Sequence, residues 1–339
     1  MRLLITGGAG FLGSNLALHG AEKGYEIMVL DNLSRVGSDQ NLENLIKQKN
    51  IKFENIDLRD SENLLKSISN FKPDAVFHLS GQVAMTTSIN DPRYDLEINL
   101  MGTFNLLESL RTIGMKIPII YSSTNKVYGD LEQFTYKKNN TRYTCIEYPN
   151  GFDEKITLDF HSPYGCSKGA AEQYILDYCR LFGIKSVIFR HSSMYGPSQH
   201  STFDQGWVGW FCKQFLLLKE NKIKEISISG NGFQVRDLLF SSDMANLYYD
   251  ALDTIDAVSG NAFNIGGGIE NSLSLIELFS FLSEEIGVEY SLQKNKPRFS
   301  DQKFFVADIN KINKHINWKP LVSYQDGLRM ALSWIQNKK

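Results

Sequence analysis

The chain of 339 residues is poor in the residue patterns that mark metal and redox sites. Its four cysteines, Cys145, Cys166, Cys179 and Cys212, are 21, 13 and 33 residues apart, which matches neither a CxxC redox pair nor paired metal ligands. The six histidines are scattered and form no HxxxH or HEXXH arrangement. We therefore expect reduced, mostly structural thiols and no metal site.

The chain also lacks an excess of charge and long apolar runs. Thirty-six basic and 38 acidic residues leave a formal charge of -2, and no basic block could neutralise a row of phosphates. No apolar run approaches the roughly 18 residues that span a bilayer, and MRLLITGGAG reaches a glycine turn before a signal segment could form. We expect a cytoplasmic protein that binds neither nucleic acid nor membranes.

What remains is an ordinary globular composition, with 42% hydrophobic and 22% charged residues, which excludes a mainly disordered or collagen-like chain. In the first half, apolar β-branched runs alternate with segments of helical period, which predicts an α/β fold with a doubly wound parallel sheet covered on both faces. The expected strands are RLLITG, YEIMVLD, IKFENID, DAVFHLS, PIIYSS and IKSVIFRH, and the expected helices are 11–23, 40–49, 60–69, 92–113 and 163–182.

The second half predicts a smaller mixed α/β lobe. Its strands are shorter (EISISG, NAFNIG), and helices are expected near 207–221, 242–254, 274–286 and 323–337. We expect the first domain to comprise 1–190 plus about 240–266, and the second lobe about 191–239 plus 267–339. Residues 130–161 form a long aperiodic insertion, which predicts a flap or a subunit contact, the alternative being a plain surface insertion.

A glycine-rich turn follows the first expected strand. Gly7, Gly10 and Gly13 in TGGAGFLG let the backbone approach a pyrophosphate, and the helix that follows offers free N–H groups. Eighteen residues after Gly13, Asp31 ends the second strand, where a carboxylate accepts hydrogen bonds from an adenosine ribose and repels a 2′-phosphate. This pattern predicts a Rossmann-type domain that binds NAD, with Arg35 keeping NADP open as an alternative.

Other strand ends fall beside the same predicted crevice. Asp57 ends the third strand, where an adenine could be contacted, although a turn or a helix cap would also explain it. The fourth strand ends at Leu79 to Gln82.

Tyr164 and Lys168 lie four residues apart on an expected helix and therefore share a face. Bringing a tyrosine of pKa about 10 near 7 takes roughly 3 units, or about 4 kcal/mol, of phenolate stabilisation, which Lys168 and a positive nicotinamide ring could provide. Thr124 ends the fifth strand, and its hydroxyl can reach the same substrate oxygen. The alternative is a packed aromatic ring with a solvated lysine.

The glycine turn, Thr124 and the YGCSK motif together resemble the extended short-chain dehydrogenase/reductase family, whose nucleotide-sugar epimerases and dehydratases use a Ser or Thr, a Tyr and a Lys in these places. The resemblance covers essentially the whole chain. It implies catalysis by Thr124, Tyr164 and Lys168. It implies NAD contacts from Gly7, Gly10, Phe11, Leu12, Gly13, Asp31, Asn32, Asp57, Leu58, Leu79, Gln82, Asn99, Tyr164, Lys168 and His191, with ordinary packing as the alternative for His191.

The resemblance also narrows the reaction. STNKVYGDLEQ, RYTCIEYPNGFDE, FRHSSMYGP, FDQGWVGWF and GNGFQVRD are similar to family members that epimerise CDP-linked 3,6-dideoxyhexoses at C2. This implies hydride removal to NAD, a 2-keto sugar, and hydride return to the opposite face. The family's dehydratases carry an Asp-Glu pair after the threonine; here Asn125 and Lys126 stand there, so elimination lacks its acid and base. Another nucleotide-sugar 4-epimerase or reductase, or a non-enzymatic NAD sensor, remains an alternative.

The resemblance further implies how a sugar nucleotide is held. Arg236 matches a pyrophosphate position, and Arg298 with Asp301 matches a pair near the nucleotide; a guanidinium suits this because it is planar and always charged. For each arginine a surface salt bridge is the alternative. Ser193 stands where many relatives have asparagine. Further expected substrate contacts are Gln82, Thr86, Thr124, Asn125 and Val208. Relatives also imply a homo-oligomer, either a dimer or a tetramer.

Overall fold

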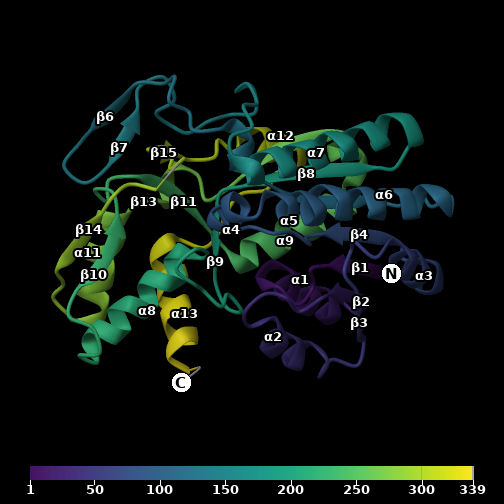
Figure 1. Cartoon of the computed structure of the whole chain (residues 1–339), viewed down its shortest axis with the longest axis horizontal. Coiled ribbons are helices and arrows are strands. Elements are labelled where there is room, and N and C mark those ends of the chain that lie inside the picture. The colour runs from purple at the N-terminus through teal and green to yellow at the C-terminus, as the bar shows by residue number, and fades with distance from the viewer. Residues whose placement is uncertain (299, 338–339) are drawn as a thin grey trace.

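The computed structural model describes residues 1–298 and 300–337, which form two lobes (Figure 1). The larger lobe is built on a seven-stranded parallel sheet in the order β12-β8-β5-β4-β1-β2-β3. The chain runs outward from β1 to β3 and then crosses back to β4, so the strand order reverses beside β1, where ligands bind in such sheets. The strands are β1 (Arg2–Thr6), β2 (Glu26–Asp31), β3 (Ile51–Asn55), β4 (Ala75–His78), β5 (Ile119–Thr124), β8 (Ser186–His191) and β12 (Asn261–Ile265).

Helices cover both faces of this sheet because alternate strand residues point to opposite sides. Leu3 and Ile5 pack in one core cluster with residues of α1 (Phe11–Glu22) and α9 (Ser241–Asp253). Leu4 packs in another with residues of α3 (Ser61–Phe71), α6 (Gly102–Thr112) and α7 (Ser162–Phe182). The structure thus confirms the doubly wound α/β class, and burial on both faces explains the continuous apolar runs.

The expected helix over 92–113 is present over Pro92–Thr112, where α5 (Pro92–Leu96), a π-helical turn (Glu97–Met101) and α6 follow one another without a break. The short helix α4 (Met85–Asn90), which the periodicity did not predict, precedes it. Asp91 caps α5 through the Tyr94 N–H, and Pro92 occupies its first turn. The π turn lets Asn99 point into a buried polar network. Helix α2 (Ser38–Leu45) begins and ends earlier than expected.

The second lobe contains short strands and three longer helices around its own core. Strands β9 (Ser193–Tyr195), β11 (Val235–Phe240), β13 (Ser272–Ser274) and β15 (Phe304–Phe305) form one small sheet, and β10 (Ile226–Ser229) pairs with β14 (Leu292–Asn295). The helices are α8 (Trp207–Lys219), α11 (Leu275–Ile286) and α13 (Tyr324–Asn337), with the short α10 (Ile255–Val258) and α12 (Asn310–Ile316) elsewhere. The chain returns from this lobe to add β12 beside β8 in the large sheet.

The insertion over 130–161 packs onto the second lobe. It contains the hairpin of β6 (Tyr136–Lys138) and β7 (Tyr143–Cys145). Phe152 packs against Phe304 and Phe305, and Arg142 Nε donates to Glu277 at 2.7 Å. A role in subunit contact stays a prediction.

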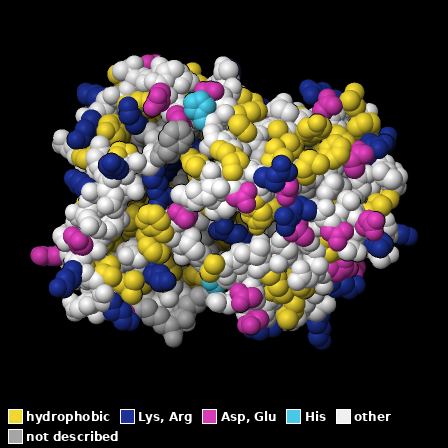
Figure 2. Space-filling model, viewed as in Figure 1, with side chains coloured by type: hydrophobic (Ala, Val, Ile, Leu, Met, Phe, Trp, Pro, Cys, Tyr) yellow, Lys and Arg dark blue, Asp and Glu magenta, His cyan; other side chains and the backbone are white. Residues whose placement is uncertain are grey.

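The surface agrees with the balanced composition. Figure 2 shows acidic and basic side chains interspersed over the visible face. Among residues 1–298 and 300–337, none of the helices combines the length and the hydrophobicity that a membrane span requires.

Candidate active site

A cavity of about 380 Å³ lies at the carboxyl ends of the central strands, where the strand order reverses. The glycine turn after β1 and the ends of β2 to β4 line one side, and residues of the 194–205 segment line another. Eleven of the predicted cofactor residues line it: Gly7, Gly10, Phe11, Leu12, Gly13, Asp31, Asn32, Asp57, Leu58, Leu79 and Gln82.

The glycines of the turn are needed for its shape. Gly7 has φ +67°, in the left-handed region, and a Cβ there would lie 2.7 Å from the Ser80 nitrogen. A Cβ on Gly13 would lie 2.3 Å from the Gly7 carbonyl oxygen. The glycines therefore leave the turn without side chains, and its backbone packs closely at the start of α1. This is the geometry that accepts a pyrophosphate.

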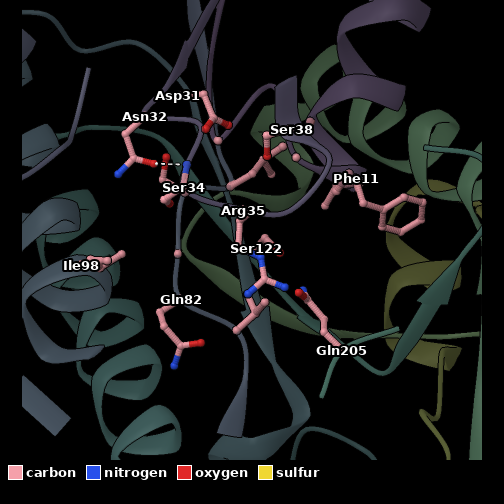
Figure 3. Close-up of a pocket in the computed structure, with 18 of the residues that line it drawn as sticks. Phe11, Asp31, Asn32, Ser34, Arg35, Ser38, Gln82, Ile98, Ser122 and Gln205 are labelled. Atoms are coloured by element: carbon pink, nitrogen blue, oxygen red, sulfur yellow. Dashed lines mark hydrogen bonds between the residues drawn. The ribbon is translucent and has the colours of Figure 1, made fainter. Parts of the chain in front are cut away.

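Asp31 ties the end of β2 to the glycine turn. Its Oδ2 accepts from the Ala9 N–H at 3.1 Å, its Oδ1 accepts from the Leu33 N–H at 2.8 Å, and burial raises the pKa of this carboxyl. Figure 3 shows Asp31 and Asn32 beside the cavity, with Asn32 accepting from the Ser34 N–H at 3.1 Å. Arg35 extends from the same loop toward Gln205 and brings a positive charge into the cavity (Figure 3).

Asp57 is also a turn residue. Its carboxylate accepts from the Arg59 guanidinium at 2.8 Å and from the Asn32 amide at 2.8 Å, and the Arg59 hydrogen bond lowers the pKa of Asp57 to about 2. Its Oδ1 also accepts from the Arg59 N–H, while the cap of α3 is Asp60. Asp57 therefore stabilises the turn after β3 and also lines the cavity, whereas the cap of α3 is another residue.

The structure brings the three predicted catalytic side chains together. Thr124 ends β5, α7 packs against β5, and the Thr124 hydroxyl hydrogen-bonds to Tyr164. Lys168 Nζ donates to the carbonyl oxygen of Ser122, a cavity-lining residue, at 2.5 Å. Gly81, which also lines the cavity, lies beside Lys168, since a Cβ on Gly81 would lie 3.6 Å from Nζ. The group thus lies directly behind the wall of the cavity.

Burial dominates the electrostatics of this group. It raises the pKa of Tyr164 to about 12, and the Thr124 hydrogen bond opposes the shift. It lowers the pKa of Lys168 to about 7, opposed by the charges of Asp95 and Glu172. The protein by itself therefore holds Tyr164 as the phenol, so the sequence-based figure of roughly 3 units is too small. The phenolate needs about 5 units of stabilisation to form near pH 7.

A buried polar network that the sequence did not reveal holds α5, the π turn and α7 together. The Asn99 amide donates to the Ser167 hydroxyl at 3.0 Å and to the Gln82 carbonyl oxygen at 3.1 Å. The Asp95 carboxylate accepts from Ser167 at 2.5 Å, and burial raises the pKa of Asp95. Asn99 thus lies outside the cavity lining and acts on it through Gln82. In the sequence, burial of Asp95 could have been suspected only from the position of this carboxylate within a mainly apolar helical stretch.

His191 is packed rather than exposed to the cavity. Its Nε2 lies 2.9 Å from the Tyr248 hydroxyl, and the two rings are parallel within 2°. Burial, with a smaller effect of the Lys168 charge, lowers the pKa of His191 to about 3, so the ring is neutral. Beside it, a buried ion pair that the sequence also did not reveal joins Arg190 to Glu172, with Nε 3.1 Å from Oε2.

The second lobe contributes a smaller cavity of about 140 Å³, lined by Arg236, Arg298 and Asp301 together with Trp207 and Trp210. Arg236 Nη2 pairs with Asp301 Oδ1 at 2.7 Å. Arg298 donates instead to the carbonyl oxygen of Phe203 at 3.0 Å. The two predicted arginines therefore converge on one cavity.

The other predicted substrate residues are more dispersed. Ser193 accepts from the Trp207 indole at 2.9 Å, and Val208 is 1% exposed in the core of the second lobe. Asn125 donates to the Gln302 side chain at 2.9 Å. The Thr86 hydroxyl is buried and has no hydrogen-bond partner within the described residues. In residues 1–298 and 300–337, no group of three His, Cys, Asp or Glu side chains could hold a metal ion.

Comparison with known proteins places this geometry in a family. Residues 4–331 match the family model described as GDP-mannose 4,6-dehydratase. The chain is 54% identical to CDP-paratose 2-epimerase of Salmonella typhi over 334 residues, which covers 98% of this chain and 99% of the relative.

Two solved structures share the fold along the whole chain. The UDP-glucose 4-epimerase of Thermus thermophilus, in complex with NAD, has a TM-score of 0.83 at 29% identity and covers 100% of both chains. The dTDP-glucose 4,6-dehydratase of Streptomyces venezuelae, with NAD bound, has a TM-score of 0.83 at 26% identity and covers 99% of this chain and 97% of the other. Since the family match includes every candidate site residue, the chain belongs to the GDP-mannose 4,6-dehydratase family of extended short-chain dehydrogenases/reductases.

Proposed function

We propose that the chain is an NAD-dependent isomerase that interconverts CDP-paratose and CDP-tyvelose, which are CDP-linked 3,6-dideoxyhexoses, by inverting C2. The observation that carries the substrate is the 54% identity with CDP-paratose 2-epimerase over 98% of the chain. The chemistry is supported by the buried group of Thr124, Tyr164 and Lys168 behind the wall of the larger cavity.

The residues around the larger cavity fit NAD. The bare glycine turn at the start of α1 suits the pyrophosphate, and the Asp31 carboxylate at the end of β2 suits a ribose and disfavours a 2′-phosphate. Arg35 adds a cation on the same wall. Bound there, NAD would supply the hydride acceptor for C2 of the sugar and the donor that returns the hydride to the opposite face.

The protein's own groups handle the proton. Tyr164 removes the proton from the C2 hydroxyl and later gives it back, since its phenol is the acid-base group of the cluster. Thr124 orients that phenol through their hydrogen bond, and Lys168 stabilises the phenolate by its charge. Asn125 is a neutral amide and the Lys126 ammonium donates to the Ser300 carbonyl oxygen at 2.8 Å, so no carboxyl pair follows Thr124 to eliminate water.

The second lobe holds the sugar nucleotide in this proposal. Arg236 and Arg298 supply two guanidinium groups for the diphosphate, and Asp301 supplies a carboxylate for the nucleotide. Gln82 in the cavity wall and the unpartnered hydroxyl of Thr86 are candidates for sugar contacts. Ser193 and Asn125 act from the edges of the site.

The test is NMR spectroscopy of CDP-paratose incubated with the protein in deuterated water. We expect CDP-tyvelose to form with hydrogen retained at C2, because hydride removal and return exchange nothing with solvent. Deuterium at C2 would show a carbanion route and refute the mechanism. Turnover of UDP- or dTDP-sugars alone would identify another epimerase, and NAD binding without turnover of any of these sugars would identify a sensor.

A homo-oligomer is part of the same proposal. Helix α7 leaves apolar side chains at the surface, with Tyr174 45% and Leu181 68% exposed, and such residues are suited to cover one another in an assembly. Light scattering of the purified protein measures the state directly. A monomer at micromolar concentration would contradict it.

A further inference from the structure

Part of the wall of the larger cavity comes from the second lobe. Ser198, Gln199 and His200 line the cavity, although they follow β9 of the small sheet and precede α8. We call residues 197–200 the strap. The glycine turn of the first lobe also lines this cavity, and the strap contacts both α1 and α2.

Asn41 of α2 joins the strap to the glycine turn. Its side chain is 5% exposed, and its Nδ2 donates both to the Ala9 carbonyl oxygen and to the Ser198 carbonyl oxygen, each at 3.1 Å. Its Oδ1 lies 3.2 Å from His200 Nε2. One amide therefore contacts the turn and two positions of the strap, which lies more than 150 residues away along the chain.

Asn15 of α1 makes a second and separate attachment. Its Nδ2 donates to the Phe11 carbonyl oxygen at 2.8 Å and to the Pro197 carbonyl oxygen at 3.0 Å. Asn15 lies outside the cavity lining, so it acts on a bound molecule only through its two partners, the strap and the backbone of Phe11.

The backbone of the strap shows that these contacts hold it in place. Ser198 has φ +68°, in the left-handed region that a serine occupies only when its surroundings stabilise it. His200 is seated over Gly37, where a Cβ would lie 2.0 Å from the imidazole ring. The strap is thus fitted to the bare backbone at the start of α2.

We propose that the strap is a retention device for the dinucleotide, with Asn15 and Asn41 as its positioning residues. This inference rests on the proposed function, which leaves the cofactor chemically unchanged after each turnover. If the cofactor left between the two half-reactions, the keto sugar could not be reduced again, so slow release of the cofactor favours complete turnover. The strap slows this release by joining the two lobes beside the cavity.

The experiment measures NAD⁺ release from the full chain. The protein is loaded with radiolabelled NAD⁺ and chased with excess unlabelled NAD⁺, and the retained label is followed by filtration. We expect Asn15→Ala and Asn41→Ala each to release NAD⁺ about five- to tenfold faster, the effect of losing about one net hydrogen bond. The control is Asn50→Ala, because Asn50 also donates to two backbone carbonyls, of Ala21 and Tyr25, but remains within the first lobe.

The outcomes separate the possible failures. Faster release from both strap variants, with wild-type release from Asn50→Ala, supports the strap. Faster release from Asn41→Ala alone refutes it, because Asn41 would then act by direct contact. Equal acceleration by all three variants refutes it as a general loss of stability, which thermal unfolding checks separately. Wild-type protein that binds no NAD⁺ overturns the proposed function itself and the strap with it.

Discussion

Tyr164→Phe tests the chemical assignment most directly, because it removes one oxygen and leaves the ring. The ring is 8% exposed and lies on α7 among packed neighbours, so phenylalanine keeps its shape. We expect the variant to retain NAD⁺ and to lose epimerisation by about 10²- to 10⁴-fold, the usual effect of a lost acid-base group. This corresponds to about 3 to 5 kcal/mol of transition-state stabilisation.

The structure shows why this oxygen needs help to act as a base. Burial raises the pKa of Tyr164 to about 12, so at pH 7 only about one molecule in 10⁵ carries the phenolate. Moving the pKa to 7 requires about 7 kcal/mol of preferential phenolate stabilisation. Lys168 contributes part of it as a cation, but burial has lowered its own pKa to about 7. The remainder is assigned to the positive nicotinamide ring.

The assay follows conversion of CDP-paratose by NMR and retained NAD⁺ by filtration, for the parent and for two variants. Tyr174→Phe is the matched control, because it makes the same change on the same helix at a side chain that is 45% exposed. The control should turn over at the parental rate. Near-normal turnover by Tyr164→Phe would refute the assignment, and loss of NAD⁺ retention would show that the ring oxygen serves binding instead.

Three further predictions test the second lobe and the buried charges. Arg236→Met should raise KM for CDP-paratose about 10- to 100-fold, because charge-assisted hydrogen bonds are lost, and it should leave NAD⁺ retention unchanged. The surface variant Arg329→Met is its control. An unchanged KM in Arg236→Met contradicts the assignment of Arg236 to the sugar-nucleotide site. Glu172→Gln should lower the free energy of unfolding by about 3 to 5 kcal/mol, because it leaves the buried Arg190 charge unpaired. Urea unfolding measures this free energy, and a variant as stable as the parent contradicts the prediction. Burial raises the pKa of the Asp237 carboxyl to about 6. Between about pH 4 and pH 6 the folded protein therefore keeps a proton that the unfolded chain has released. Protonated Asp237 stabilises the fold by about 1 kcal/mol more at pH 5 than at pH 7. Asp237→Asn should abolish that increment, and an unchanged pH dependence of urea unfolding refutes the assignment.

Motifs that depend on neighbours in the sequence could be predicted. The turn from Gly7 to Gly13 and the carboxylate of Asp31 lie at the ends of adjacent apolar strands, and parallel strands bring their carboxyl ends to one edge. Tyr164 and Lys168 could be paired because helix geometry alone sets a spacing of four residues on one face. The fold class followed from the same periodicities.

Contacts between distant residues could not be predicted, although the family resemblance had indicated Asn99, Arg236 and Asp301 as site residues. Asp95 and Asn99 act in the buried network because a π turn replaces regular helix, and that turn is set by packing against α7. Arg236 meets Asp301 across 65 residues, and Asn41 meets Ser198 across 157. No local period encodes such contacts.

The sequence by itself determined the strand-turn-helix fingerprint and the sheet that positions it, because both follow from periodicity and local sterics. It also predicted Thr124, Tyr164 and Lys168 as catalytic, through the shared helix face of Tyr164 and Lys168 and through the family resemblance. Only the tertiary structure decided the electrostatics of the site. Burial moves the pKa of Tyr164 upward and that of Lys168 downward, because desolvation depends on the whole enclosing fold. The tertiary structure likewise decided that the strap of the second lobe would close the cavity of the first, since that contact exists only once both lobes have packed.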